Sequence, residues 1–326
     1  MNVLITSASR KVALVRAFQR ALAATGGGIV VAGDASASAA ALYLADRGVI
    51  LPRSDADDFV SEIIRLCSEQ NIGLVVPTRD EELPVFASAR ERFEERGVAV
   101  AISSPSAIAT CQDKGAFLAF CTANGFSTPD VLVPDDLAEG DFPVFLKPRV
   151  GKGGRGAQRI DSRVDLLRAL SAVDDALVQV YCNLPELTLD VFVDRDSRVL
   201  SVLPRTRTLV VGGESYISTT VKNDRLIRRG EDLVVALGLY GHLTVQCFWS
   251  KDASDGEPSF IEVNPRFGGA ANLGFAAGHP TPEYLVRSAL GERVERRVGE
   301  FEDGLTMLRY AQDVFVTRDG VQRDLT

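Results

Sequence analysis

The sequence predicts a mixed α/β and α+β fold in three parts: an N-terminal parallel-sheet domain, a small α+β domain and a mostly antiparallel C-terminal domain. Three observations support this prediction. Short apolar runs alternate with helical patterns over residues 1–106, which indicates a Rossmann-like sheet covered on both faces. A glycine-rich loop follows a strand within residues 107–180. Residues 181–326 are expected to form mostly antiparallel strands with supporting helices, with a hairpin turn between the first two strands.

The N-terminal domain is expected to alternate strands with helices. We expect strands at 3–5, 29–32, 74–76 and 98–102, and helices at 13–24, 59–70 and 87–95. Ligands of parallel sheets bind at the carboxyl ends of the strands, where Ser7, Asp34 and residues 78–82 lie. No GxGxxG motif follows the first strand, and the glycine triplet at 26–28 follows a helix. A nicotinamide-dependent enzyme is therefore disfavoured.

The other two domains are expected to contain longer strands and fewer helices. In the small domain we expect a helix pair at 106–124, strands at 142–147 and 177–180, and a helix at 162–170. In the C-terminal domain we expect strands at 187–193, 199–204, 243–249 and 259–264, and helices at 228–239 and 282–290. Residues 194–197 are expected to form the hairpin turn between the first two of these strands.

Composition excludes several functional classes. The formal charge of −8 argues against nucleic acid or an anionic membrane as the main partner, because the net field repels both. Five scattered cysteines without a CxxC pair, and only two histidines, argue against a disulfide framework and a zinc site. No apolar run is long enough to span a bilayer. These features predict a cytoplasmic protein.

A glycine-rich loop at residues 151–156 is the first candidate for ligand chemistry. Four glycines among these six residues allow phosphate oxygens close to the main chain and leave backbone N–H groups free to face an anion. No acidic residue lies between 147 and 160. The cations of this segment are Lys147, Arg149, Lys152, Arg155 and Arg159. On this segment alone, a mobile surface loop with solvated charges is an equal alternative.

The strand expected at 259–264 carries a sharper pattern. Alternate residues of a strand point the same way, so Glu262, Asn264 and Arg266 are expected on one face, with Ile261 and Val263 in the core. Carboxylate and carboxamide oxygens suit Mg²⁺, and an arginine suits a phosphate oxygen. Gln246, on the preceding expected strand, can add another oxygen. The alternative is a solvent-facing edge of an antiparallel strand.

The segment 177–181, followed by Glu186, is uninformative alone. A strand that runs into an exposed hinge offers backbone groups to an adenine edge, and a later carboxylate can hold ribose hydroxyls.

The order of all these motifs along the chain carries more weight than any one of them. They are Pro77-Thr78-Arg79-Asp80-Glu81-Glu82-Leu83, Asp113-Lys114, Phe145-Leu146-Lys147-Pro148, the 151–156 loop, Gln179 with Glu186, Pro204-Arg205 with Gly212-Gly213-Glu214, Val245-Gln246, and residues 261–269.

In this order the sequence resembles the ATP-grasp superfamily, most closely single-unit ligases that look like one half of the carbamoyl-phosphate synthase large chain. The resemblance covers essentially the whole chain and implies the ATP-grasp architecture, with ATP and Mg²⁺, or Mn²⁺ in its place, as cofactors. It implies the following roles: ATP phosphates at Lys114, Lys147 and Arg266; the lid at Gly153, Gly154 and Gly156; adenine at Gln179, Val180 and Tyr181; ribose at Glu186; metal at Gln246, Glu262 and Asn264; and acyl phosphate at Arg205, with Arg207 and Lys222 as alternatives.

Two departures from the family pattern are informative. Gln179 replaces a frequent glutamate, which is harmless if the main chain reads the adenine. Gln246 replaces an acidic residue of many relatives, so fewer formal charges hold the metal. Because there is one ATP-grasp unit, complete carbamoyl phosphate synthesis is disfavoured.

The expected function is an ATP-dependent carboxylate–amine ligase that acts through an acyl phosphate. Its substrate is expected to be an amino acid read by Arg79, Asp80 and Glu81; the alternative for these residues is a solvated helix start. The alternatives for the function are a non-catalytic ATP-binding sensor or partner subunit, and a carbamoyl-phosphate-type ligase that uses carbonate or ammonia. Small-molecule carboxylates and amines are the expected partners, and a homodimer is compatible with the sequence. His242 and His279 have no assigned role.

Overall fold

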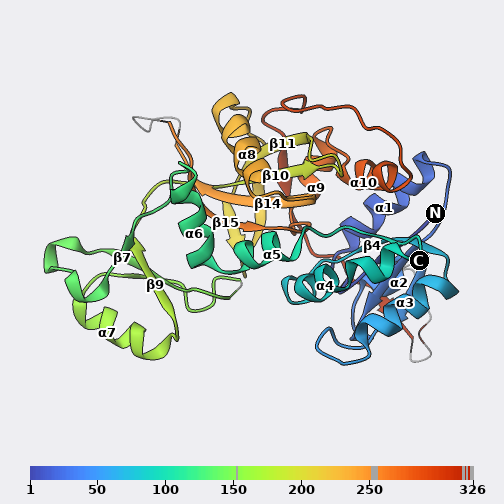
Figure 1. The fold of residues 1–326 in the computed structure, drawn as a ribbon, viewed down its shortest axis with the longest axis horizontal. Coiled ribbons are helices and arrows are strands. Elements are labelled where there is room, and N and C mark those ends of the chain that lie inside the picture. The colour runs from blue at the N-terminus through green and yellow to red at the C-terminus, as the bar shows by residue number, and fades with distance from the viewer. Residues whose placement is uncertain (152, 251–255, 318–319, 321, 324–326) are drawn as a thin grey trace.

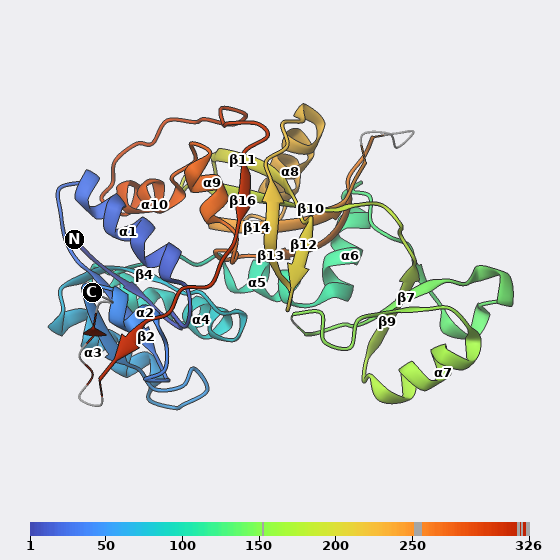
Figure 2. The ribbon, with the colours of Figure 1, turned by 180° about the vertical axis from the view of Figure 1, so that it is seen from behind.

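The predicted mixed architecture is confirmed by a computed structural model, which describes residues 1–151, 153–250, 256–317, 320 and 322–323. The N-terminal domain lies at one end of the molecule and the small domain at the other, with the main antiparallel sheet between them (Figure 1). After β16 (Thr306–Leu308) the chain runs back toward the N-terminal domain (Figure 2). No helix among the described residues has the length and apolar character needed to cross a bilayer.

The N-terminal domain is built on a parallel sheet with the strand order β3-β2-β1-β4-β5. Its strands are β1 (Asn2–Ile5), β2 (Val30–Asp34), β3 (Arg47–Ile50), β4 (Ile72–Val76) and β5 (Ala99–Val100). Its helices are α1 (Val12–Ala24), α2 (Ala41–Leu44), α3 (Phe59–Glu69), the short 3-10 turn Asp80–Glu82 and α4 (Leu83–Glu94). The strand order reverses between β1 and β4, so the carboxyl ends of these two strands flank a switch point.

The small domain contains a four-stranded antiparallel sheet in the order β6-β9-β7-β8. Its elements are β6 (Val131–Leu132), the 3-10 turns Pro134–Asp136 and Glu139–Asp141, β7 (Val144–Pro148), β8 (Gln158–Ile160), α7 (Arg163–Ala172) and β9 (Ala176–Val180). A small apolar core that includes Val144, Leu146 and Val178 joins the sheet to α7. The glycine-rich loop connects β7 to β8, two strands that pair with each other.

The C-terminal domain contains a second antiparallel sheet in the order β11-β10-β14-β15. Its strands are β10 (Glu186–Val193), β11 (Val199–Thr206), β14 (Gly241–Phe248) and β15 (Ser259–Asn264). The smaller sheets are β12 (Leu209–Val211) with β13 (Glu214–Thr219) and β16 (Thr306–Leu308), and β17 (Phe315–Val316) with β18 (Gln322–Arg323). The helices are α8 (Asp224–Ala236), α9 (Asn272–Ala276) and α10 (Thr281–Ala289).

The helix pair α5 (Pro105–Gln112) and α6 (Lys114–Ala123) differs from the sequence prediction in its packing. The predicted domain boundary at residue 107 places this helix pair in the small domain. In the structure both helices contact β15, and Cys111 and Phe117 belong to the core of the C-terminal domain. Apolar side chains on these helices are covered by the large antiparallel sheet, so the small domain proper begins near β6.

Strand β15 also differs from the prediction in one detail. The register shifts between Gln246 and Cys247, which leaves Ile261 without a facing partner on β14. Such a bulge reverses the alternation of side chains along the strand. Phe260 is therefore fully buried in place of Ile261, which is only half-buried, while Val263 stays in the core as expected.

Candidate functional site

The predicted metal-binding residues lie on β14 and on β15, the edge strand of the large antiparallel sheet. Gln246 on β14 lies directly opposite Glu262 on β15. Asn264 Nδ2 donates to Glu262 Oε1 (3.1 Å), and Arg266 Nη2 donates to Asn264 Oδ1 (3.2 Å). The donor set is one carboxylate and two amides, which offers only oxygens to a cation and suits Mg²⁺ better than a softer metal. To bind a metal, Asn264 Oδ1 would have to give up its bond from Arg266.

Lys147 on β7 brings the small domain to this site. The side chain is 4% exposed, and burial lowers the pKa of its ammonium to about 8. The carboxylate of Glu262 opposes this shift, while the nearby cation Lys114 adds to it. The structure therefore places Lys147 and Lys114, two of the three predicted phosphate contacts, within electrostatic reach of each other. It also places Lys147 within reach of the metal-binding carboxylate of Glu262.

The glycine-rich loop is held at both ends by contacts outside the small domain. Lys114 Nζ donates to Gly151 O (2.8 Å). On the far side, a Cβ placed on Gly213 would lie 3.3 Å from Cα of Gly153, so the loop packs on the turn between β12 and β13 (Figure 2). Gly153 and Gly154 have φ of +63° and +69°, and a Cβ at either would meet nothing within 4 Å. At Gly153 the loop backbone therefore lies close against the backbone of Gly213 in the hairpin.

Not all cations of this segment are available for a phosphate. Arg149 forms a bidentate pair with Asp113, with Nε–Oδ1 and Nη2–Oδ2 distances of 2.7 and 2.8 Å. Arg159 pairs with Asp161. Lys152 lies outside the described residues. The cation-rich segment thus includes two arginines that have structural partners. Lys147 is its buried cation that faces the site.

The expected adenine hinge follows β9. Gln179 is 2% exposed, and its Nε2 donates to Pro129 O (2.8 Å). Val180 donates its backbone N–H to Asp130 O (3.0 Å). Both groups tie β9 to the preceding chain, so any adenine contact falls to other backbone groups of the hinge. The hinge continues through Tyr181 to the half-buried Cys182. The guanidinium carbon of Arg159 lies over the Tyr181 ring, 4.7 Å from the ring centroid.

Glu186 and Arg207 form an ion pair at the start of β10, with Arg207 Nε 2.9 Å from Glu186 Oε1. Burial raises the pKa of the Glu186 carboxyl, Arg207 opposes this, and the nearby Glu262 adds to it. Arg207 Nη2 also donates to Gly213 O (3.2 Å). Arg207 therefore links a half-buried carboxylate near the metal-binding residues to the hairpin turn that contacts the glycine-rich loop.

The three cations considered for the acyl phosphate lie in different surroundings. Arg205 is 2% exposed, and its guanidinium is bonded to Asp190 (Nε–Oδ2 2.7 Å, Nη2–Oδ1 3.4 Å). Lys222 is exposed, and its backbone N–H donates to Asp303 Oδ1 (2.7 Å). Arg207 borders Glu186 and the hairpin. A phosphate contact from Arg205 would require its buried pair to open, so Arg207 is the better-placed cation.

The predicted substrate residues after β4 reach the metal-binding strand. Asp80 forms a bidentate pair with Arg266 (Nε–Oδ1 3.0 Å, Nη2–Oδ2 2.9 Å). Arg79 and Glu81 pair with each other at the surface. Lys11 was not among the predicted site residues, because it directly precedes helix α1, yet its ammonium lies near Glu82 and Arg266. The signal available in the sequence was the polar loop directly after the first strand.

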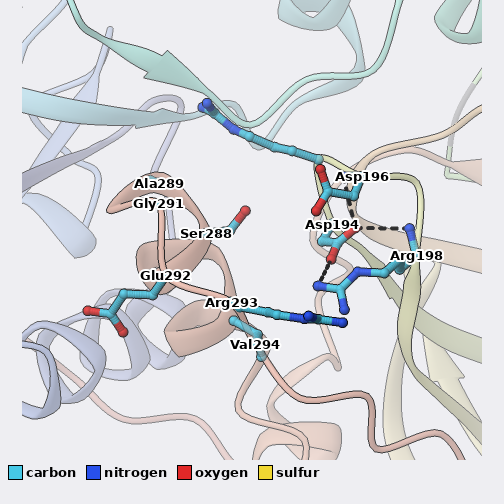
Figure 3. Close-up of a pocket in the computed structure, with 10 residues that line it drawn as sticks. Asp194, Asp196, Arg198, Ser288, Ala289, Gly291, Glu292, Arg293 and Val294 are labelled. Atoms are coloured by element: carbon cyan, nitrogen blue, oxygen red, sulfur yellow. Dashed lines mark hydrogen bonds and ion pairs between the residues drawn. The ribbon is translucent and has the colours of Figure 1, made fainter.

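A cavity with a volume of about 530 Å³ lies elsewhere, between the β10–β11 turn and the end of α10 (Figure 3). Its residues include Asp194, which bonds to Arg198 (2.6 Å) and to two backbone N–H groups. None of the predicted site residues lines it. Within the described part of the chain, no group of three or more His, Cys, Asp or Glu residues could hold a metal there or elsewhere.

Comparison with known proteins relates both halves of the chain to described families. Residues 3–101 match a family model described as PylC-like, N-terminal domain, and residues 172–312 match one described as ATP-grasp in the biosynthetic pathway with Ter operon. A carbamoyl-phosphate synthase of Methanobrevibacter smithii is 25% identical over 249 residues, or 71% of this chain. The match spans 66% of that relative's length, slightly under two thirds.

Solved structures show the same fold. Biotin carboxylase from Campylobacter jejuni superposes with a TM-score of 0.74 and 18% identity, covering 93% of this chain and 74% of that chain. L-amino acid ligase from Bacillus licheniformis superposes with a TM-score of 0.70 and 20% identity, covering 96% and 81%. At these identities the similarity is one of architecture.

Proposed function

Because the chain belongs to the ATP-grasp superfamily of ATP-dependent ligases, we propose that it joins a carboxylate to an amine as an amide. In the first step a carboxylate oxygen attacks the γ-phosphorus of ATP, the bond to the β-phosphate oxygen breaks, and ADP leaves. In the second step the amine nitrogen attacks the acyl carbon, phosphate leaves with the C–O electron pair, and the amine loses a proton. Such phosphoryl transfer depends on positioning and on neutralising charge.

The observation that carries the proposal is the meeting of Gln246, Glu262 and Asn264 with Lys147. Lys147 and Lys114 would hold phosphate oxygens of ATP, and Arg266 would neutralise charge at the transferred group. Gln246, Glu262 and Asn264 would hold Mg²⁺, or Mn²⁺ in its place, which supplies positive charge to the phosphates. The lowered pKa of Lys147 fits this role, because binding of a polyanion favours its charged form.

The glycine-rich loop and the hinge complete the proposed nucleotide site. Gly153, Gly154 and Gly156 would cover the triphosphate, and exclusion of water there would protect the acyl phosphate from hydrolysis. The hinge after Gln179, with Val180 and Tyr181, would hold the adenine, and Glu186 the ribose. The Arg207 guanidinium would face the acyl phosphate, in preference to Arg205 and Lys222.

Release of ADP over panels of carboxylates and amines tests the reaction directly. We expect ADP and phosphate to appear in equal amounts with the amide for at least one pair of compounds. Panels with carbonate or ammonia as one component separate a carbamoyl-phosphate-type ligase from the proposed one. Production of AMP would contradict the mechanism, and nucleotide binding without turnover for every pair would favour a sensor or partner subunit.

Cys182 provides a direct test of the hinge. It is half-buried, while the other four cysteines are buried, and burial raises the thiol pKa of each of those four to about 12. A maleimide should therefore react first at Cys182, because thiolate and access control the rate. We expect MgATP to slow this labelling at least about tenfold, measured by mass spectrometry of peptides.

The variant Cys182→Ser is the control for this experiment, since it should remove the fast phase of labelling and keep ADP release. Labelling of Cys182 at the same rate with and without saturating MgATP would place the adenine away from the hinge.

A further inference from the structure

Polar residues gather at the switch point of the N-terminal sheet, the place where open α/β sheets have a crevice. We define the switch-point crevice by Ser7 and Lys11 after β1 and by Asp80 and Glu82 after β4. The two loops are joined by hydrogen bonds, since Thr78 Oγ1 donates to Ser7 O (2.9 Å) and Ser7 Oγ to Glu82 Oε2 (2.8 Å). In open α/β sheets, ligands bind outside the carboxyl ends of the strands where the strand order reverses. The topology thus marks this crevice as a ligand position.

The backbone after β1 is strained at this point. Ser7 and Ser9 have φ of +48° and +46°, in the left-handed region that serine rarely adopts. Surrounding bonds hold them there, because Ala8 donates its N–H to Gly33 O (3.0 Å) and Ser9 donates its N–H to Asp34 Oδ2 (2.9 Å). Strain of this kind persists only where the surroundings over-determine it, and it gathers at ligand sites.

Lys11 is a cation with hydrogen-bond donors to spare. Its Nζ donates to Ser7 O (2.9 Å), and an ammonium has three donors. Burial lowers the pKa of Lys11 to about 8; Glu82 and Asp34 oppose this, and Arg266 and Arg79 lower the pKa further. Within the described residues, Ser7 O is the acceptor bonded to this ammonium. A buried ammonium with donors to spare and two arginines nearby favours a bound anion.

The carboxylate of Glu82 does not fill that place. Glu82 is fully buried, and its Oε1 accepts the backbone N–H groups of Thr78 (2.5 Å) and Arg79 (3.0 Å). Its Oε2 accepts the hydroxyl of Ser7. Glu82 therefore fixes the two loops of the crevice, and both of its carboxylate oxygens already accept hydrogen bonds from these loops.

Hydrogen bonds connect the switch-point crevice to the proposed reaction centre. Asp80 at its rim holds Arg266 by two hydrogen bonds, and Arg266 in turn contacts Asn264 of the metal-binding set. An anion bound by Lys11 would thus lie beside the arginine that serves the transferred phosphate.

We propose that Lys11 binds the carboxylate of a small carboxylic-acid substrate in the switch-point crevice, next to Arg266. The substrate is a free amino acid or a short dicarboxylic acid, and its carboxylate lies among Lys11, Arg79 and Arg266. This assignment rests on the proposed ligase function, because that reaction requires such a substrate. It extends the substrate residues from the Arg79, Asp80 and Glu81 loop to the loop after β1.

The titration of Lys11 tests the site without any turnover. The full-length protein is reductively methylated with ¹³C-formaldehyde, and the Lys11 resonance is identified by its loss in Lys11→Arg. We expect it to titrate near pH 8 and its midpoint to rise when a bound carboxylate stabilises the charged form. The probes are the proteinogenic amino acids and the dicarboxylic acids from malonate to adipate, with chloride as the control anion. If none of the amino acids or dicarboxylic acids raises the titration midpoint of Lys11, the proposal is overturned.

Kinetics separates this proposal from the proposed function. In Lys11→Met we expect the KM of the carboxylate to rise about 10- to 100-fold, as for loss of a charged hydrogen bond. The KM of ATP should stay within about twofold. Arg10→Gln, at the exposed neighbour, removes the same charge and should change neither.

The outcomes of the two experiments are distinct. Unchanged carboxylate KM in Lys11→Met, in an active enzyme, would overturn the site and leave the ligase function standing. A raised Lys11 midpoint without ADP release for any pair would support the site and contradict the ligase function.

Discussion

Glu262→Gln is expected to lower the rate of ADP release by about 1000-fold or more, with nucleotide affinity changed much less. Glu262 supplies the only formal negative charge among Gln246, Glu262 and Asn264, and it lies directly opposite Gln246 on the neighbouring strand. Loss of the charge that holds a catalytic cation removes stabilisation mainly in the transition state, where charge develops on the transferred phosphate. The glutamine keeps the size of the side chain and an oxygen that can accept from Asn264. Steady-state ADP release and equilibrium binding of ATP measure the two effects separately.

A pH profile adds a second readout to this variant. Burial lowers the pKa of Lys147 to about 8, and the charge of Glu262 limits this shift. Removal of the Glu262 charge should therefore lower the pKa of Lys147 further. Lys147 then loses its proton at a lower pH, and ATP binding should weaken from a lower pH upward. Glu231→Gln, on α8 in a surface pair with Arg296, is the matched control and should change neither property. Near-normal ADP release by Glu262→Gln would remove Glu262 from the proposed metal site.

The fold could be predicted from the sequence wherever one face of an element is buried. Strand β15 has the expected bounds, and within it Glu262, the buried Val263 and Asn264 alternate as expected. Strand β3 was not predicted, since Arg47 and Ile50 are exposed at the edge of the sheet and give no apolar pattern. Helix α4 begins at Leu83, earlier than expected, where Pro84 fits the first turn. Edges and short turns lack the burial that makes a pattern visible.

The candidate site was predicted in its local parts and missed in its long-range ones. The proximity of Glu262 and Asn264 follows from the two-residue period of a strand. The pairing of Asp80 with Arg266 joins segments 186 positions apart, and no pattern in either segment encodes it. The same holds for Arg205, whose sequence neighbourhood resembles a phosphate contact while its partner Asp190 lies on the adjacent strand. Which cation is structural and which is catalytic is decided by tertiary pairing.

Arg205 and Asp190 form a buried polar network beneath the site. Both are almost fully buried, at 2% and 4% exposure, and Asp190 Oδ1 lies 3.7 Å from Nε2 of His242. Burial would raise the pKa of the Asp190 carboxyl, but Arg205 and His242 outweigh it and hold that pKa well below its ordinary value. Asp190 is therefore charged at neutral pH, and each partner depends on the other to offset its desolvation.

Asp190→Asn and Arg205→Met are each expected to lower the free energy of unfolding by about 3–5 kcal/mol, because each leaves one buried charge without its partner. The double variant should be less destabilised than the sum of the two, since it leaves neither charge behind. Urea unfolding followed by circular dichroism measures all three. Arg207→Met provides the contrast: it should unfold near the wild-type midpoint, because its partner Glu186 is 34% exposed, and it should lose ADP release. If Arg205→Met keeps full stability and loses activity, Arg205 is the acyl-phosphate contact and Arg207 is not.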